Sequence, residues 1–218
     1  MAITMSKAKP LKKQIAKKSQ LVNASLELFL KRGFHPTRIE DIIARAKVGK
    51  GTFYLYFKNK EDVVEYMADQ FIQEIMETMN WVQENIHQGT SLAPLFHEES
   101  IRLAKTFEQN QKVARFFFRE GRAVGKSINQ KIQHFYNQLT DMSELTFILA
   151  TKAGLLQGVH PKIAAVAIMG GIIQMYERWV EGNLDMPLID IIQQTLGFFE
   201  KGLGMNMNTL TKNAGTKP

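Results

Sequence analysis

The sequence predicts an all-α protein in which an N-terminal three-helix domain, containing a helix-turn-helix, precedes a domain of about six helices. Apolar residues recur at spacings of three and four along most of the chain, which is the period of an amphipathic helix. No stretch shows the convincing alternation of apolar and polar residues that is typical of a β-strand. After residue 60 the helical pattern is broken by turn-forming residues, at 89–91, 109–111, 121–125, 158–161 and 182–187. These breaks separate the later helices.

The first helix is expected from about Lys12 to Arg32. Its apolar stripe consists of Ile15, Val22, Leu26, Phe29 and Leu30. Gly33 stands where a helix-ending glycine belongs, because glycine tolerates the left-handed conformation that closes many helices. Residues 1–12 are basic and are expected to form a flexible arm that ends near Pro10.

Residues 37–60 have the pattern of a helix-turn-helix. Thr37, with Glu40 three residues later, predicts a capping box at the start of a helix. The helical pattern stops at residues 47–49, and a second short helix is expected from about Lys50 to Phe57. Two short helices joined by a tight turn containing glycine are the unit that places its second helix in a DNA major groove. Residues 13–60 are therefore predicted to be a DNA-binding domain.

The positive charge of the chain is concentrated in the same region. Residues 1–60 hold 14 Lys and Arg against three acidic residues, whereas residues 61–218 hold 14 against 18. A solvated basic tail explains the lysines from Lys7 to Lys18, but it does not explain the cations within the helix-turn-helix. Nucleic acid is the better interpretation, because binding to DNA requires cations that neutralise phosphates.

Several classes of protein are disfavoured. The chain has no cysteine, which excludes disulfides, cysteine zinc sites and thiol nucleophiles. No segment is long and apolar enough to cross a membrane, and the N-terminus lacks the apolar run of a signal peptide, so a cytoplasmic protein is expected. The five histidines show no metal-ligand spacing, the GKGT stretch at 49–52 lacks the spacing of a phosphate-binding loop, and no catalytic grouping is apparent. No cofactor, metal or catalytic residue is predicted.

The N-terminal pattern resembles that of the TetR family of transcriptional regulators. It covers about 45 residues and consists of Leu21, Val22, Ala24, Ser25, Phe29, Gly33, Phe34, Thr37, Ile39 and Ile42, then Val48, Gly51, Thr52, Phe53, Tyr54, Tyr56, Phe57, Lys60 and Glu61. The sequence departs from the family at Lys47, where glycine is usual, and at Gly49, where serine or threonine is usual. Gly49 therefore lacks the hydroxyl that often caps the second helix and touches a phosphate.

The residues expected to contact DNA lie on or beside the helix-turn-helix. Phe53 and Phe57 are four apart and are assigned to the domain core, which leaves Tyr54 as the best candidate for base or sugar contact. An exposed Leu55 would suit a thymine methyl group. The resemblance implies phosphate contacts from Tyr56 and Lys60. The full set is Thr37, Arg38, Lys47, Gly49, Lys50, Gly51, Thr52, Tyr54, Leu55, Tyr56 and Lys60.

Residues 61–205 are predicted to be a helical domain for ligand binding and dimerisation. Asn59 is expected to cap a helix that runs on past Val82 without a flexible linker and so acts as a lever. Apolar and aromatic residues of the middle helices are candidates for a ligand pocket, although ordinary core packing accounts for most such residues. The candidates are Met67, Phe71, Phe107, Phe117, Phe118, His134, Phe135 and Met142.

The last two predicted helices, at 161–181 and 187–203, are apolar on more than one face. Such a helix must be buried on more than one side, either as ordinary core or against a second copy of the chain. The resemblance favours a four-helix bundle between two subunits. Its expected residues are Ala167, Gly170, Gly171, Met175, Trp179, Ile192, Leu196 and Phe199. Residues 206–218 are polar and are predicted to be a disordered tail.

Taken together, these features predict a dimeric one-component regulator. We expect a repressor that binds a palindromic double-stranded operator and leaves it when a small hydrophobic or amphipathic molecule binds. Two alternatives are a nucleoid or adaptor protein that binds DNA without sensing a ligand, and a helical enzyme. The first predicts weak sequence preference, and the second predicts turnover without DNA.

Overall fold

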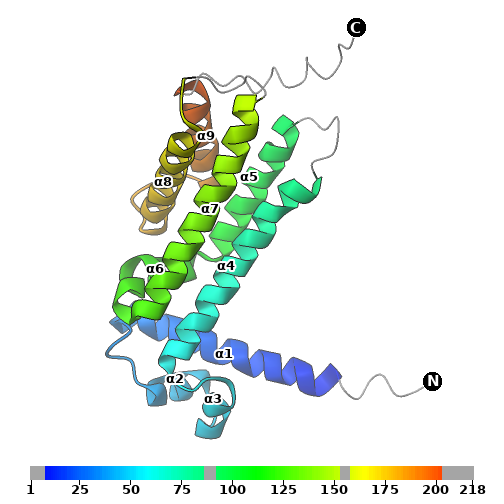
Figure 1. Cartoon of the computed structure of the whole chain (residues 1–218). Helices are drawn as coiled ribbons and strands as arrows, with labels where there is room; N and C mark the ends of the chain where they lie inside the picture. The colour runs from blue at the N-terminus through cyan, green and yellow to red at the C-terminus, as the bar shows by residue number, and fades with distance from the viewer. Residues whose placement is uncertain (1–7, 86–91, 153–157, 203–218) are drawn as a thin grey trace, which may run out of the picture. The chain divides into compact units, whose positions relative to one another are not determined.

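The computed structural model describes residues 8–85, 92–152 and 158–202, and these residues form helices and turns without any strand. The all-α prediction, with three helices followed by six, is confirmed (Figure 1). The predicted breaks near residues 110, 125, 158 and 182 all separate helices. The helices of the described residues are α1 (Ala8–Arg32), α2 (Ile39–Ala46), α3 (Lys50–Tyr56), α4 (Lys60–Asn85), α5 (Leu92–Gln109), α6 (Gln111–Val124), α7 (Lys126–Lys152), α8 (Pro161–Val180) and α9 (Leu188–Gly202).

The chain divides into two compact units. The head unit contains the described residues up to Gln70 together with Arg115–Gln130, and the body unit contains the remainder. The chain passes between the units at residues 70–71, 114–115 and 130–131, and each passage lies inside a helix, namely α4, α6 and α7. The sequence indicated a boundary between the DNA-binding domain and the helical domain after residue 60. The head unit is larger than that, because it also holds the first part of α4 and most of α6.

The head unit is built around buried aromatic and aliphatic residues from several helices. Leu21 and Phe29 of α1, Ile42 of α2 and Phe53 of α3 are each at most 1% exposed. Phe116 of α6 is also fully buried, and its ring stacks on that of Phe29 with centroids 5.4 Å apart. This contact explains why α6 belongs to the head unit.

Helix α1 begins earlier than the sequence predicted. It starts at Ala8, so residues 8–12 are helical and the expected flexible arm does not reach residue 12. Pro10 stands in the first turn of α1, where proline is tolerated because the N–H that it lacks has no helical partner. The rest of the expected arm, residues 1–7, and the expected tail, 206–218, lie outside the described residues.

The start of α4 agrees with the prediction. The Asn59 side chain accepts a hydrogen bond from the Asp62 N–H at 2.7 Å, as an N-cap should. The Asp62 carboxylate in turn accepts one from the Lys58 N–H at 2.9 Å. Because α4 continues to Asn85, no flexible linker follows the helix-turn-helix.

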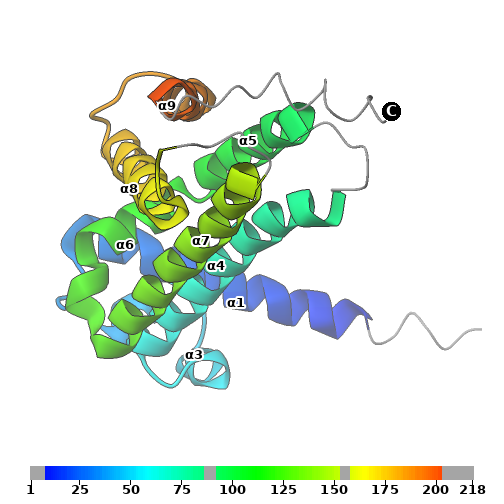
Figure 2. The same cartoon turned by 45° about the horizontal axis from the view of Figure 1, so that its top comes forward.

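In the body unit, α9 packs against both α5 and α8, as Figure 2 shows. An apolar cluster is formed by Ile75 of α4, Phe135 and Leu139 of α7, and Met169 of α8. Gly182 ends α8 at a positive φ of 81°, and Asn183 donates a hydrogen bond back to the Arg178 carbonyl at 2.8 Å. None of the described helices is long and apolar enough to span a membrane.

Candidate nucleic-acid interface

Helix α2 starts one residue later than the capping box that the sequence predicted. The N-cap is Arg38, whose N–H donates to the Asp41 carboxylate at 3.0 Å. This hydrogen bond, with the Arg32 guanidinium nearby, holds the pKa of Asp41 below its usual value. Thr37 lies before the helix and is 1% exposed, and its hydroxyl donates to the Gly33 carbonyl at 2.8 Å. The Thr37 side chain is therefore enclosed within the head unit, and the DNA contact expected of it stays a prediction.

The turn between α2 and α3 is closed by Lys47 in an unusual backbone conformation. Its φ of 53° and ψ of 44° are left-handed, a region that glycine occupies more easily. The Lys47 and Val48 N–H groups donate to the carbonyls of Ala44 and Ile43, both at 3.2 Å. This geometry explains why glycine is usual at position 47 in the family that the sequence resembles. The exposed Lys47 side chain supplies a cation where glycine would supply none.

Helix α3 buries one side and exposes the other. Phe53 and Phe57 are 0% and 4% exposed, so their assignment to the core is confirmed. Tyr54 and Leu55 are 49% and 71% exposed. The exposed surface, here called the recognition face, consists of Lys47, Gly49, Lys50, Gly51, Tyr54 and Leu55.

Gly49 and Gly51 leave part of the recognition face without side chains. A side chain at Gly49 or at Gly51 would meet no other atom within 4 Å, so both positions are open to an approaching molecule. Thr52 and Tyr56, at the edges of this surface, are half-buried. Arg38 at the start of α2 is exposed. The arrangement can present cations, backbone and two large side chains to a groove of DNA.

The resemblance implies that Lys60 contacts a phosphate, but in this structure its ammonium binds backbone carbonyls of the same chain. Its ammonium donates to the carbonyls of Phe34, His35 and Thr37 at 2.9, 3.0 and 3.2 Å, and it lies 4.3 Å from the centre of the Phe34 ring. A lysine ammonium has three donors, and these carbonyls take all of them. Lys60 thus binds the connector between α1 and α2.

Helix α6 contacts the same connector, which the sequence did not reveal. The Glu120 carboxylate accepts from the Phe34 N–H at 3.3 Å. The His35 Nε2 lies 2.9 Å from the Ala123 carbonyl, and because a carbonyl only accepts, this nitrogen must carry the hydrogen. Nothing local in the sequence pairs residues that are more than 80 positions apart. The apolar Phe116, which is fully buried in the structure, is the sequence feature that comes closest to indicating that α6 packs in the head unit.

The predicted ligand-binding residues are divided between the two units. Met67, Phe117 and Phe118 belong to the head unit, where Met67 is buried. Phe71, Phe107 and Phe135 belong to the body unit and join its apolar cluster. His134 is exposed and Met142 is half-buried. The eight residues therefore do not form one cluster within either unit.

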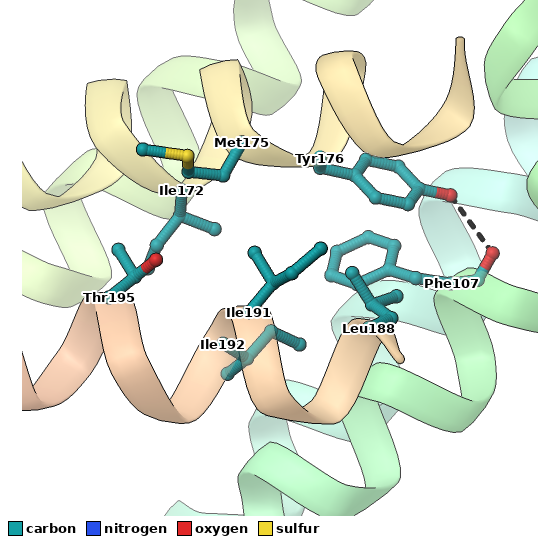
Figure 3. A pocket seen from close by; sticks show the side chains of 8 residues that line it. All are labelled: Phe107, Ile172, Met175, Tyr176, Leu188, Ile191, Ile192 and Thr195. Atoms are coloured by element: carbon teal, nitrogen blue, oxygen red, sulfur yellow. Dashed lines mark hydrogen bonds between the residues drawn. The ribbon is translucent and has the colours of Figure 1, made fainter. Parts of the chain in front are cut away.

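The body unit contains an apolar pocket that shares only Phe107 with that prediction. It is small, with a volume of about 10 Å³, and it lies between α5, α8 and α9 (Figure 3). The Tyr176 hydroxyl donates to the Phe107 carbonyl at 2.9 Å, and burial raises the Tyr176 pKa above its usual value. The lining residues are Phe107, Ile172, Met175, Tyr176, Leu188, Ile191, Ile192 and Thr195.

The predicted dimerisation residues fall into two groups. Ala167, Gly170 and Met175 are exposed on α8, while Trp179 and Leu196 are half-buried. Of the others, Ile192 is buried, and Gly171 and Phe199 are half-buried. Ile192 is 8% exposed, and a side-chain carbon on Gly171 would come within 3.0 Å of the Phe199 ring. Gly171 and Phe199 thus pack against each other within one chain, and a role in dimerisation stays a prediction for all three residues.

Fold and recognition face together define a DNA-binding protein of the helix-turn-helix class, and comparison with known proteins gives its family. Residues 21–67 match the family described as "Bacterial regulatory proteins, tetR family". These residues therefore form a DNA-binding domain of this family, and the match supports a TetR-family transcriptional regulator.

Relatives match well beyond the helix-turn-helix. The "Fatty acid metabolism regulator protein" of Bacillus subtilis (strain 168) is 23% identical over 195 residues, which cover 88% of this chain and 98% of that protein. Among solved structures, NalD, described as "the secondary repressor of MexAB-OprM multidrug efflux pump in Pseudomonas aeruginosa", has a TM-score of 0.72 at 19% identity, covering 86% and 96% of the two chains. The "transcriptional regulator FadR from Bacillus subtilis in complex with stearoyl-CoA" has a TM-score of 0.64 at 22% identity, covering 84% and 98%. At these identities the structural matches establish the shared fold.

Proposed function

We propose that this protein is a homodimeric repressor that binds a palindromic DNA operator and is released by a small amphipathic molecule. The recognition face carries this proposal. Phe53 and Phe57 hold α3 in the core of the head unit, and Tyr54 and Leu55 therefore point outward beside Lys50. Phosphate contacts would fix the orientation of the head, and Tyr54 and Leu55 would read bases.

Dimerisation is supported by apolar residues left exposed on α8. Ile163 is 64% exposed and Val166 is 55% exposed, and Ala167 and Gly170 continue the same helical face. Apolar residues gathered on one face of a helix are typical of a surface that another protein covers. A second copy would place two recognition faces on one operator, with half-sites about 34 Å apart.

The proposed effector binds the body unit. The apolar lining of the pocket has the chemistry that a hydrocarbon chain requires, and α5, α8 and α9 would have to separate to admit one. Long-chain acyl-CoA is the first class to test, because a structural neighbour is described with stearoyl-CoA and a relative is named as a regulator of fatty acid metabolism.

Effector binding can act on the head because the units are joined inside helices. A movement of α4, α6 or α7 in the body unit continues into the head unit without a flexible linker. The effector must bind the DNA-incompetent arrangement more tightly than the competent one, since only differential affinity shifts such an equilibrium.

The test is selection of bound sequences from a random DNA pool, followed by titration of the selected DNA complex with acyl-CoA of increasing chain length. We expect a palindrome and release by the longer chains. Tyr54→Ala is the matched variant, and its affinity for the selected DNA should fall about tenfold while binding to random DNA changes little. Enrichment of no sequence would favour the nucleoid alternative, and a palindrome unaffected by acyl-CoA would refute this class of effector.

A further inference from the structure

The strongest side-chain arrangement outside the recognition face surrounds the Lys60 ammonium. Lys60 is the first residue of α4, and it lies more than 20 positions along the chain from the carbonyls of Phe34, His35 and Thr37 that it binds. Together these bonds tie the start of α4 to the connector that leads into α2.

The connector is held from a second side as well. Phe34 is 1% exposed, its ring packs edge-on against Phe29 at 5.2 Å, and its N–H donates to the Glu120 carboxylate. The connector ends at Arg38, where α2 begins. The direction in which the chain enters α2 is therefore set by α1, α4 and α6 together, and Lys60 supplies three of the polar contacts.

We propose that Lys60 is a positioning residue that sets the angle of the helix-turn-helix, and that it is not a phosphate ligand. This inference rests on the proposed DNA-binding function. A phosphate ligand needs donors that face solvent, whereas the Lys60 donors converge on three carbonyls of the same chain. Lys60 affects DNA binding through α2, and so through the α3 that α2 carries.

Lysine and arginine separate the two roles. An ammonium can direct three bonds from one nitrogen to converging carbonyls, whereas a guanidinium is a flat fork that cannot reproduce this geometry. Arginine is, however, an excellent phosphate ligand. If Lys60 is a positioning residue, Lys60→Arg should therefore weaken operator binding. If Lys60 is a phosphate ligand, Lys60→Arg should retain operator binding.

The experiment compares Lys60→Arg and Lys60→Met with the same changes at Lys50, an exposed residue of the recognition face. Affinities for operator and random DNA are measured over a range of salt concentrations, at a temperature where circular dichroism shows every variant to be folded. For both Lys60 variants we expect operator affinity to fall about tenfold or more, with little change on random DNA and an unchanged salt slope. For Lys50→Met the slope should fall by about 0.9 for each phosphate that the variant no longer neutralises, and Lys50→Arg should retain it.

Two results would overturn the inference. If Lys60→Arg binds operator as the wild type does while Lys60→Met lowers the salt slope, Lys60 is a phosphate ligand. If both Lys60 variants melt at lower temperature but keep the wild-type ratio of operator to random affinity, Lys60 serves stability alone. A wild-type protein that bound no DNA would instead refute the proposed function, which separates the two failures.

Discussion

Single residues of the head unit show how side-chain chemistry and backbone conformation are balanced against each other. Lys47 keeps a cation on the recognition face although its left-handed backbone suits glycine better. For a residue with a Cβ this conformation costs roughly 1–2 kcal/mol. Position 47 therefore exchanges stability for charge, and restoring glycine there tests this balance.

Lys47→Gly should stabilise the protein and weaken its DNA binding. We expect the free energy of unfolding to rise by about 1 kcal/mol, because the left-handed strain is relieved. The salt slope of DNA binding should fall by about 0.9 for each phosphate that the lysine neutralised. Denaturant unfolding and salt-dependent binding give the two quantities. Lys50→Gly is the control, since it removes the same charge but places glycine at the first residue of α3, where no left-handed strain is relieved and stability should not rise. A Lys47→Gly variant that was less stable than the wild type would contradict the strain argument.

Glu99 of α5 makes stability depend on pH. Burial without a compensating charge raises its pKa from the ordinary 4.5 to about 7. A carboxyl whose pKa is raised by folding favours the folded state while it is protonated. Its contribution is complete below about pH 4.5 and is lost as the pH rises through 7.

Glu99→Gln should remove this loss. Between pH 4.5 and 8, the free energy of unfolding of the wild type should fall by up to about 3 kcal/mol relative to that of Glu99→Gln, since each unit of pKa shift corresponds to about 1.4 kcal/mol. Denaturant unfolding across this range measures the difference. Glu108→Gln, at an exposed position of the same helix, is the control. Equal pH profiles for the wild type and Glu99→Gln would contradict the assignment.

At the scale of elements, the packing of α8 on α9 depends on the absence of a side chain. Phe199 lies where a side chain on Gly171 would stand, whereas Gly170 has open space around it within the subunit. The two neighbouring glycines of α8 therefore serve different purposes. One allows α9 to approach, and the other lies on the face proposed to meet a second copy.

Gly171→Val should destabilise the subunit by roughly 1–3 kcal/mol, because it inserts methyl groups into a filled space. The loss should be the same at every protein concentration, since the contact lies within one chain. Gly170→Val is the matched control, and any loss it causes should depend on protein concentration, because it would act through the dimer. Thermal unfolding at several concentrations distinguishes them. A Gly171→Val variant as stable as the wild type would show that Phe199 moves aside freely.

At the scale of the whole molecule, the proposed operator binding needs two chains. The stripe on α8 proposed to meet a second copy consists of four exposed residues, Ile163, Val166, Ala167 and Gly170. Two recognition helices double the phosphates and bases that are contacted, so dimerisation and operator affinity should fall together.

Val166→Asp should shift the protein to a monomer without unfolding it. A charge on the α8 stripe would be buried by a partner but is solvated in the free subunit. The substitution should therefore weaken dimerisation without lowering the stability of the subunit. Sedimentation velocity measures the mass, and operator affinity should decrease in parallel. Leu145→Asp, at a residue of α7 that is 58% exposed and outside the stripe, should remain a dimer. A dimeric Val166→Asp would place the interface elsewhere.

What the sequence determined is local. Helical periodicity, turn residues and capping patterns predicted the helices that the structure describes, the turn before α3 and the Asn59 cap, because these features depend on residues close together in the chain. The recognition face followed from the same periodicity, since Phe53 and Phe57 lie four apart and leave Tyr54 on the other side. Charge distribution then indicated nucleic acid.

The tertiary structure alone decided which distant groups meet. It enclosed Thr37, turned the Lys60 ammonium onto three connector carbonyls, brought Glu120 to Phe34 and seated Phe199 against Gly171. None of these contacts follows from spacing, because each joins residues from different helices or loops whose approach depends on how the whole unit packs. A lysine in a family motif has the same letters whether its ammonium faces a phosphate or a carbonyl, and only the fold fixes where its donors point.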